Sequence, residues 1–422
     1  DEDSKGANGI DHIGREVDQR LCQRCDHRSH SPKSLVRIGA KSLSQASPLA
    51  RLALSGMSER IPLFDTSTPL EPLRAALDDA ISSVVEGGRF ILGPEVSEFE
   101  CEFAGAMGTS QAVGVANGTD ALELALRGVG VGPGDEVVVP SLTFYATAEA
   151  VPPTGATPVF CDIDPTTGCV TAETVKAALT PKTKAVVAVD LFGNVAPIPE
   201  IEALGVPVVE DAAQAAGAKL NGKPAGSLGK AASFSFFPSK NLGCFGDGGA
   251  VVTSDQSVAE MVRTLRFHGS KDKKTFDFIG RNSRLDEIQA AVLRVLLPEL
   301  PKWTAGRQQA AAAYREAGIA DFVTPIEPVD GSEPAWHLYV VRHERADELG
   351  AALNDAGIEA RGYYRVPVHR QPSMAEWGTG ADLPGTEELA RTNLAIPISP
   401  VLTAGQAARV VETIEDALSK LD

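Results

Sequence analysis

The chain has 422 residues, of which 43% are hydrophobic and 23% charged, enough to bury a sizeable core in one large or two ordinary domains. Its 39 Lys and Arg against 56 Asp and Glu give a net charge of -17, which argues against a general nucleic-acid binder. No apolar run approaches the roughly 20 residues that span a bilayer, the start Asp1-Glu2-Asp3 is unlike a secretory signal, and six Cys are too few for a disulfide framework, so we expect a cytoplasmic protein without a membrane partner.

Residues 1–60 differ in composition from the rest of the chain. They contain no Phe, Tyr or Trp, so they bury too little apolar surface to offset their ordering entropy, and we expect a disordered leader. One cluster within them, Cys22, Cys25, His27 and His30, has ligand types that suit zinc. Its spacing is too compressed for a zinc finger, so we favour a leader without metal, and no metal site is expected.

From Ile61 to about residue 300, short apolar β-branched runs alternate with helical patterns. The runs are 112–115, 136–139, 158–161, 185–189, 207–209 and 250–252, and the helical patterns include 121–126 and 172–179. Near-continuous apolar strands that alternate with helices predict an α/β fold with a mostly parallel sheet covered on both faces. Sites in such sheets gather at the C-terminal strand ends, so the residues after each strand are the candidates for chemistry.

Three of these strand ends carry suitable groups. The segment Asn117–Asp120 opens a helix, and its N–H groups and helix dipole can bind an anion, although an ordinary helix start has the same pattern. Phe144 follows the run 136–139 and offers an aromatic face. Asp211 follows the run 207–209 and is either an acid at a strand end or a helix N-cap.

A lysine among aromatics and glycines follows the next predicted strand. Residues 233–237 alternate Ser and Phe, and they lead to Lys240 and the glycine-rich run 243–249. Desolvation lowers the pKa of a lysine and favours the neutral amine, which attacks carbonyls. A phosphate-anchoring lysine is the alternative, but the spacing G-x-x-x-x-G-K is absent, and no G-x-G-x-x-G turn occurs early in the fold.

The combination of these groups fits one cofactor, pyridoxal phosphate. This cofactor needs an amine for its aldehyde, an anion for its ring nitrogen, donors for its phosphate and a face for stacking. Lys240, Asp211, the 118–119 turn and Phe144 can supply these, and Ser235 stands five residues before the lysine.

The stretch from Ile61 to about Gly405 resembles the DegT/DnrJ/EryC1/StrS family of sugar aminotransferases, members of the aspartate aminotransferase superfamily with fold type I. The matching segments cover most of the chain and are 118–122, 143–144, 209–214, 234–241, 280–291, 383–384, 387–390, 396–397 and 400–403. The resemblance implies a large cofactor-binding domain over 61–305 with a mostly parallel seven-stranded sheet, and a smaller C-terminal α+β domain over 306–422.

The resemblance also implies a role for each matching residue. Lys240 would form the internal aldimine and shuttle the proton, and Asp211 would keep the pyridinium nitrogen protonated, which makes the ring a better electron sink. The other implied cofactor residues are Gly118, Thr119 and Ser235 at the phosphate, Gln214 and Phe144 at the ring, and Asn282, which reaches the phosphate from the partner subunit of a homodimer.

The implied reaction moves an amino group from an amino acid, usually L-glutamate, to a keto carbon of a nucleotide-linked sugar. Arg284 and the basic loop 270–274 are candidates for the sugar nucleotide, although a solvated turn has the same composition as this loop. Where family members often carry His-Tyr, this chain has Tyr363-Tyr364. We therefore expect Tyr363 and the nearby His369 to border the sugar.

Three other functions stay open at this point. Deoxysugar dehydratases of the same family commonly have His in place of the aldimine lysine, so Lys240 favours transamination. A non-catalytic regulatory protein on the same scaffold has no need of Lys240, Asp211 and Ser235 together. A nicotinamide oxidoreductase is the most distant alternative because its glycine fingerprint is absent.

Overall fold

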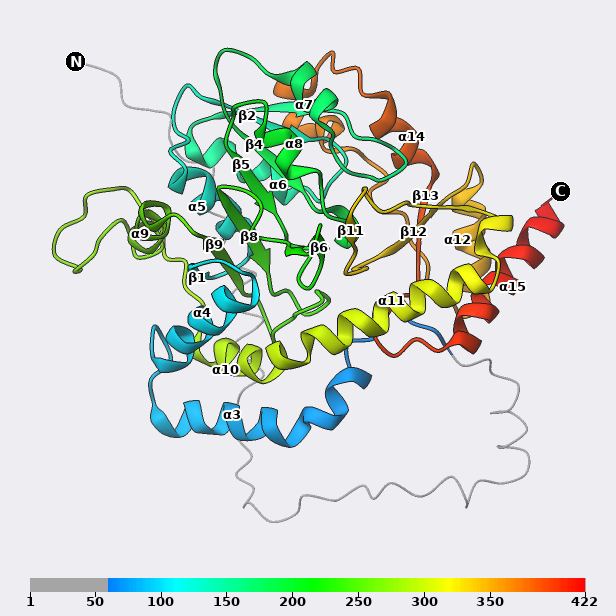
Figure 1. Cartoon of the computed structure of the whole chain (residues 1–422), viewed down its shortest axis with the longest axis horizontal. Coiled ribbons are helices and arrows are strands. Elements are labelled where there is room, and N and C mark those ends of the chain that lie inside the picture. Colours follow the sequence, from blue (N-terminus) through cyan, green and yellow to red (C-terminus); the bar gives the residue numbers. More distant parts are fainter. Residues whose placement is uncertain (1–59, 422) are drawn as a thin grey trace, which may run out of the picture. The chain divides into compact units, whose positions relative to one another are not determined.

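The structure is a computed structural model that describes residues 60–421, and the predictions for the leader and for Cys22, Cys25, His27 and His30 lie outside the described residues. The predicted α/β fold with a mostly parallel seven-stranded sheet is confirmed (Figure 1). Its strands are, in the spatial order β1-β9-β8-β5-β4-β2-β3, Gln111–Val115, Gly249–Thr253, Ala231–Ser235, Val208–Asp211, Thr183–Val189, Glu136–Pro140 and Thr157–Cys161.

Strand β9 is antiparallel to both of its neighbours, β1 and β8. Its first residue, Gly249, pairs with Val115 at the end of β1 and with Ser235 at the end of β8. A side chain at Gly249 would approach the Asn117 carbonyl oxygen to 2.4 Å. Glycine at this position therefore lets the chain that leaves β1 pass close to the end of β8.

Two hydrophobic clusters lie on opposite faces of this sheet. Val251 belongs to the cluster with helices α5 and α9, whereas its neighbours Ala250 and Val252 belong to the cluster with α3, α4 and α10. The helices are α3 (Arg74–Gly87), α4 (Pro94–Ala106), α5 (Gly118–Gly128), α6 (Ala146–Glu149), α7 (Ala172–Ala178), α8 (Ile198–Glu202), α9 (Gln256–Leu265) and α10 (Glu287–Leu296).

The C-terminal part builds a third hydrophobic cluster around a small antiparallel sheet. Strands β10 (Thr324–Pro325), β12 (Tyr339–Arg342) and β13 (Asn393–Ile396) form the sheet. Helices α11 (Leu300–Glu316), α12 (Ala346–Asp355) and α15 (Ala404–Leu421) pack in this cluster. Helix α13 (Ala375–Gly378) instead contacts β3, and the buried Leu389 and Ala390 of α14 (Pro384–Thr392) belong to the cluster with α5 and α9. Helix α11 runs across the boundary of 305/306, and the division into two domains at that point stays a proposal.

A further small sheet has the order β11 (Ser332–Glu333), β6 (Lys219–Leu220) and β7 (Lys223–Pro224).

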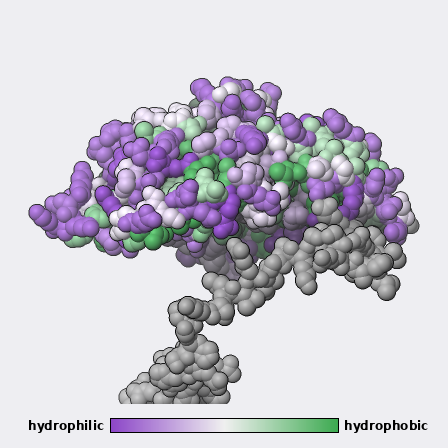
Figure 2. Space-filling model, turned by 90° about the horizontal axis from the view of Figure 1, so that it is seen from below, coloured by the Kyte–Doolittle hydropathy of each residue, from purple (hydrophilic) through white to green (hydrophobic). Residues whose placement is uncertain are grey.

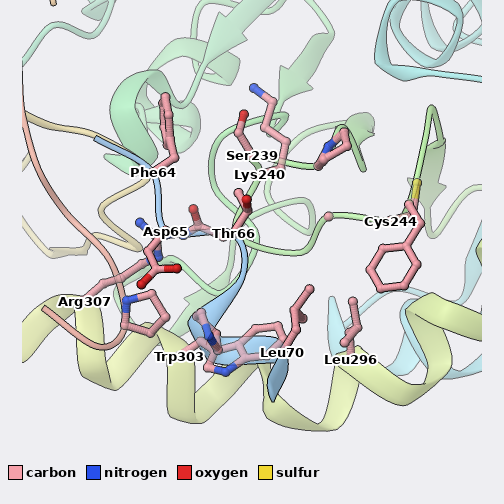
Figure 3. A pocket seen from close by; sticks show the side chains of 16 residues that line it. Phe64, Asp65, Thr66, Leu70, Ser239, Lys240, Cys244, Leu296, Trp303 and Arg307 are labelled. Atoms are coloured by element: carbon pink, nitrogen blue, oxygen red, sulfur yellow. The ribbon is translucent and has the colours of Figure 1, made fainter. Parts of the chain in front are cut away.

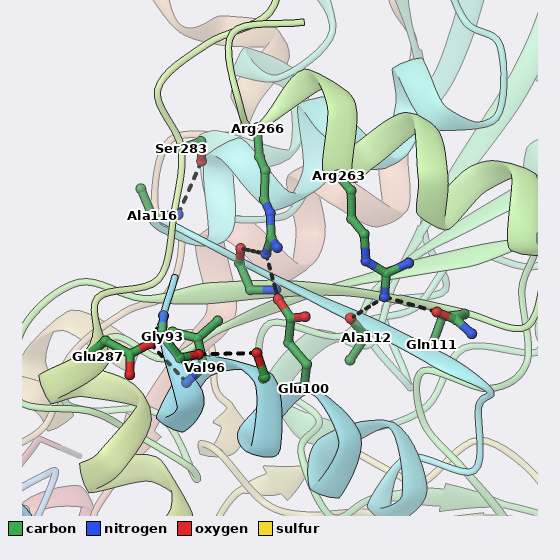
Figure 4. A network of polar contacts seen from close by, with 12 residues as sticks. Gly93, Val96, Glu100, Gln111, Ala112, Ala116, Arg263, Arg266, Ser283 and Glu287 are labelled. Atoms are coloured by element: carbon green, nitrogen blue, oxygen red, sulfur yellow. Dashed lines mark hydrogen bonds and ion pairs between the residues drawn. The ribbon is translucent and has the colours of Figure 1, made fainter. Parts of the chain in front are cut away.

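A network of polar contacts ties the chain between α9 and α10 to β1 and α4 (Figure 4). The buried Glu287 carboxylate accepts hydrogen bonds from the N–H groups of Gly93, Glu95 and Val96 at the start of α4, at 2.5 to 3.2 Å. Glu100 of α4 accepts the N–H of Gly114 at 2.8 Å and pairs with Arg266 at 2.5 Å. The Ser283 hydroxyl accepts the Ala116 N–H at 3.1 Å, which fixes the chain before α10 close to the end of β1.

The face shown in Figure 2 is mainly hydrophilic, and its hydrophobic side chains form small, separate patches. Within residues 60–421, every helix is too short or too polar to cross a bilayer.

Candidate active site

A cavity of about 400 Å³ opens where β1, β5 and β8 end. Most of the predicted site residues line it, namely Gly118, Thr119, Phe144, Asp211, Gln214, Ser235, Lys240 and Tyr363. The parallel strands deliver these side chains to one edge of the sheet, as the sequence predicted.

Helix α5 begins in the wall of this cavity. Asn117 caps it, because its Oδ1 accepts the Asp120 N–H at 2.8 Å. Within the described part of the chain, the N–H groups of Gly118 and Thr119 have no acceptor. A Cβ on Gly118 would lie 2.7 Å from the Ser235 Cβ, so glycine is required for this approach. Two N–H groups, a helix dipole and neighbouring hydroxyls make a cradle for a phosphate group.

Asp211 is buried at the end of β5. Its Oδ2 accepts a hydrogen bond from the Thr147 hydroxyl at 2.9 Å, and its Oδ1 accepts the Ala213 N–H at 3.3 Å. Burial raises the pKa of the Asp211 carboxyl, while these hydrogen bonds and the nearby charge of Lys240 act in the opposite direction. A cationic N–H placed against the carboxylate would reinforce its ionised form.

Lys240 lies on the turn that follows β8, and its N–H donates to the Phe237 carbonyl at 2.8 Å. Its side chain reaches the cavity, but protein atoms surround the amine. Burial therefore lowers the pKa of Lys240 to about 8, and the negative charge of Asp211 acts against this shift. About a tenth of such an amine is neutral at pH 7, far more than for an ordinary lysine, and the neutral form is the one that attacks a carbonyl carbon.

Gln214, Tyr364 and Phe144 form one side of the cavity. The Gln214 Oε1 accepts the Phe192 N–H at 2.7 Å, and its Nε2 donates to the Tyr364 hydroxyl at 3.2 Å. The Tyr364 and Phe144 ring centroids are 6.0 Å apart. Phe144 is 56% exposed although it lines the cavity, so its face is open to a planar ligand.

A pair of buried carboxyl groups, Asp190 and Glu210, lies behind Asp211. Glu210 accepts the N–H groups of Gly226 and Leu228 at 2.6 and 3.2 Å, whereas the buried Asp190 Oδ2 has no donor among the described residues. Burial raises the pKa of both carboxyl groups, and the proximity of Glu210 raises that of Asp190 further. Burial and the neighbouring Glu210 therefore favour the protonated form of Asp190, which limits the buried negative charge near Asp211.

A second cavity, of about 260 Å³, lies on the other side of the turn that carries Lys240 (Figure 3). In Figure 3 the Lys240 side chain points away from Trp303 and Leu70, which line the far end. Asp211 and the start of α5 do not line this cavity. The larger cavity is therefore the candidate active site.

Three predicted residues do not line the active-site cavity. Asn282 is exposed and forms a bridge with Phe267, and Arg284 lies two residues further along. His369 is buried, 2.5 Å from the Ser141 hydroxyl and 3.3 Å from Glu387. In this structure, the His369 side chain holds the segment after Pro367 against the end of β2.

Sequence reasoning missed several residues in the cavity wall, among them Phe64, Thr147, His337 and Tyr364. The sequence held a signal for Thr147, because it lies four residues after Thr143, a spacing that can bring two side chains together. In the structure their hydroxyl oxygens lie 2.9 Å apart. His337 had no such signal, since it lies about a hundred residues from Lys240 and no strand-end pattern precedes it.

The cavity fits pyridoxal phosphate by the chemistry of its groups. A partly desolvated amine, a buried carboxylate, an open aromatic face and a helix start with free N–H groups are the four partners that this cofactor needs. They converge in one cavity large enough for a small heterocycle.

Comparison with known proteins gives concordant matches. Residues 73–415 match the model of the DegT/DnrJ/EryC1/StrS aminotransferase family. A dTDP-3-amino-3,4,6-trideoxy-alpha-D-glucose transaminase of Streptomyces venezuelae is 46% identical over 372 residues, which cover 86% of this chain and 97% of the relative. A pleiotropic regulatory protein of Geobacillus stearothermophilus is 43% identical over 364 residues, covering 84% and 98% of the two chains. The crystal structure of DesV of S. venezuelae with a ketimine intermediate superposes with a TM-score of 0.82 at 45% identity, over 85% of this chain and 99% of that one.

Proposed function

The chain belongs to the DegT/DnrJ/EryC1/StrS aminotransferase family, and on that premise we propose how its residues carry out the reaction. The protein is a transaminase that moves an amino group from an amino acid to a keto sugar linked to a nucleotide. When bound, pyridoxal phosphate supplies an aldehyde that takes up the amino group and a ring that withdraws electrons.

The start of α5 would hold the cofactor phosphate through Gly118 and Thr119, with Ser235 beside them. Asp211 would hold a proton on the ring nitrogen, and the Thr147 hydroxyl fixes the orientation of its carboxylate. Gln214 and Tyr364, which already hydrogen-bond each other, would face the ring, and Phe144 would cover it. These contacts orient the ring so that its aldehyde lies next to the amine of Lys240.

Lys240 would hold the cofactor in the resting enzyme and would move a proton during the reaction. With a pKa of about 8, its amine both accepts and returns a proton near neutral pH, so it suits general acid and base catalysis. That Lys240 and Asp211 line the same cavity as the start of α5 is the single observation that carries this proposal.

For the acceptor we propose a 3-keto sugar linked to dTDP, because the relative from S. venezuelae is named for a 3-amino sugar on that nucleotide. L-Glutamate is the proposed amino donor. Tyr363 lines the cavity and would border the sugar, and Arg284 with the basic loop 270–274 would meet the nucleotide.

A homodimer with shared active sites would give Asn282 its role at the phosphate of the partner subunit. The loop between α9 and α10 projects from the sheet domain beyond α9 (Figure 1), and it exposes Phe276, Phe278 and Ile279 to 58%, 44% and 90%. Such apolar exposure suits a buried subunit contact. A cytoplasmic location stays a prediction.

The first test is covalent trapping. Purified protein with pyridoxal phosphate should be yellow. Borohydride should then fix the cofactor covalently on the peptide that contains Lys240. Lys240→Ala should lose both trapping and transamination, whereas Lys182→Ala, which changes an exposed lysine, should keep them. Label on another peptide would contradict the assignment.

The second test separates the remaining alternatives by product. With L-glutamate and a 3-keto dTDP-sugar, a transaminase yields 2-oxoglutarate and an amino sugar in equal amounts. A dehydratase yields a sugar that has lost water, and a regulatory protein without catalysis yields neither. A preference for 4-keto sugars would overturn the proposed acceptor but not the transaminase.

A further inference from the structure

A histidine without a role in the proposed reaction lies in the wall of the active-site cavity. His337 is buried just before β12 and lines the cavity together with Lys240. Phe64 stacks on its ring, with centroids 5.7 Å apart and an interplanar angle of 28°. The ring is therefore held in one plane beside the lysine.

The hydrogen bonds of Asn241, the residue next to Lys240, determine which nitrogen of His337 carries the proton. The Asn241 Nδ2 donates to the Ala335 carbonyl at 2.8 Å, and because a carbonyl only accepts, this fixes the orientation of the amide. The Asn241 Oδ1 then faces the His337 Nδ1 at 3.3 Å. An amide oxygen also only accepts, so the proton is on Nδ1 and the lone pair is on Nε2.

The surroundings keep His337 uncharged. Burial lowers the pKa of His337 well below its ordinary value, and the positive charges of Lys240 and Arg307 lower it further. No carboxylate among residues 60–421 forms an ion pair with this ring. A neutral imidazole adds no positive charge next to an amine that must itself lose a proton.

The segment that carries His337 is fixed in place by the large sheet domain. The Ala335 N–H donates to the Gly193 carbonyl at 2.9 Å, and the Leu338 N–H donates to the Phe192 carbonyl at 3.2 Å. Gly193 has φ +89°, and a Cβ there would lie 2.8 Å from the backbone nitrogen of His337. The backbone of His337 therefore has little freedom to shift, and Asn241 bonds both ends of the Ala335–His337 stretch.

We propose that His337 is a positioning residue for Lys240. As the neutral Nδ1–H tautomer it holds, through the Asn241 side chain, the turn that carries Lys240 against the chain that enters β12. The meaning of this for catalysis rests on the proposed function of Lys240, but the positioning itself is a property of the protein without cofactor.

Three substitutions at His337 separate the effect of its hydrogen-bond donor from the effect of side-chain size. His337→Asn places an amide donor where Nδ1 stands, His337→Gln places it one bond further along, and His337→Leu removes it. The observable is the rate at which Lys240 of the cofactor-free protein reacts with an acylating reagent, followed by mass spectrometry over pH 6 to 10. The rate of imine formation with pyridoxal phosphate is measured beside it.

For both reagents, we expect the rate at Lys240 of His337→Asn to lie within about twofold of the parent rate. His337→Gln and His337→Leu should react on the order of tenfold more slowly, because a displaced amine attacks poorly. Equal rates in the Gln and parent proteins overturn the proposal. So does an Asn variant as slow as the Gln variant when both unfold at the parent temperature, a comparison that holds even if the Leu variant does not fold.

Nitrogen-15 and carbon-13 shifts of the His337 ring, assigned by their absence in His337→Asn, test the tautomer directly. We expect a neutral Nδ1–H ring from pH 5.5 to 8.5. A ring that gains a proton in this range, or one that carries it on Nε2, contradicts the proposal. The acylation rate and the ring shifts are measured without keto sugar and without cofactor. They therefore test the positioning role of His337 even if the protein proves not to be a transaminase.

Discussion

The approach of Gly118 to Ser235 gives the sharpest prediction about cofactor binding. In Gly118→Ala the new Cβ lies 2.7 Å from the Ser235 Cβ and 3.3 Å from its Cα. Ordinary carbon contacts are about 3.5 to 4.0 Å, so the start of α5 and the end of β8 must move apart by about 1 Å. These two elements form the proposed phosphate cradle.

Overpacking of this kind costs about 1–3 kcal/mol. If the bound cofactor needs the parent spacing of the cradle, this free energy is lost from cofactor binding, which corresponds to a dissociation constant for pyridoxal phosphate raised by about 5- to 150-fold. Gly87→Ala is the matched control, since a Cβ there has no atom within 4 Å. Absorbance titration of the cofactor-free proteins measures both constants.

A double variant tests the cause. Ser235→Gly removes the atom that clashes, so Gly118→Ala combined with Ser235→Gly should bind the cofactor better than the sum of the two single changes predicts. Additive effects would show that the contact between the two residues is irrelevant, and a Gly118→Ala protein that binds like the parent would refute the cradle.

Three further predictions concern the charged groups. Asp211→Asn should lower the turnover number by about 10²- to 10³-fold, because an amide cannot hold the ring nitrogen protonated, and steady-state kinetics measures this. In the cofactor-free protein Lys240→Met should be more stable to urea at pH 7 than the parent. Its advantage should fade as the pH rises from about 8 to the ordinary lysine value of 10.5, because in that range the unfolded parent binds the extra proton and the folded parent does not. Asp190→Asn should change the free energy of unfolding at pH 7 by less than about 1 kcal/mol, because the replaced carboxyl already carries a proton, and a large loss of stability would contradict that protonation.

The sequence predicted elements well where local pattern decides them. The apolar runs 112–115, 136–139 and 158–161 fall inside β1, β2 and β3, and the pattern 172–179 coincides with α7 to within one residue. Apolar runs and helical periodicity express how each segment buries its own side chains, which needs no knowledge of distant partners.

Features that depend on distant pairing were beyond the sequence. The antiparallel insertion of β9 between β1 and β8 depends on the pairing of β9 with β1, which lies more than a hundred residues earlier in the chain. His337 reaches the site only because its segment pairs with Phe192 and Gly193. The strand-end rule found Asp211 and Ser235 because they end parallel strands, and Lys240 because it lies on the turn that follows β8. The rule has no equivalent for a segment that arrives from the C-terminal part.

The crowding at Gly193 has a consequence for redesign of the acceptor preference. Three backbone atoms, from Trp336, His337 and Gln214, lie within 3.0 Å of where its Cβ would be, so that wall tolerates neither larger residues nor insertions. The rim of the cavity also carries the exposed Phe144 and the partly exposed Tyr363, whose side chains can change in size with less disturbance of the main chain. Variant libraries aimed at new sugars should therefore vary Phe144 and Tyr363 and leave residues 192–193 unchanged.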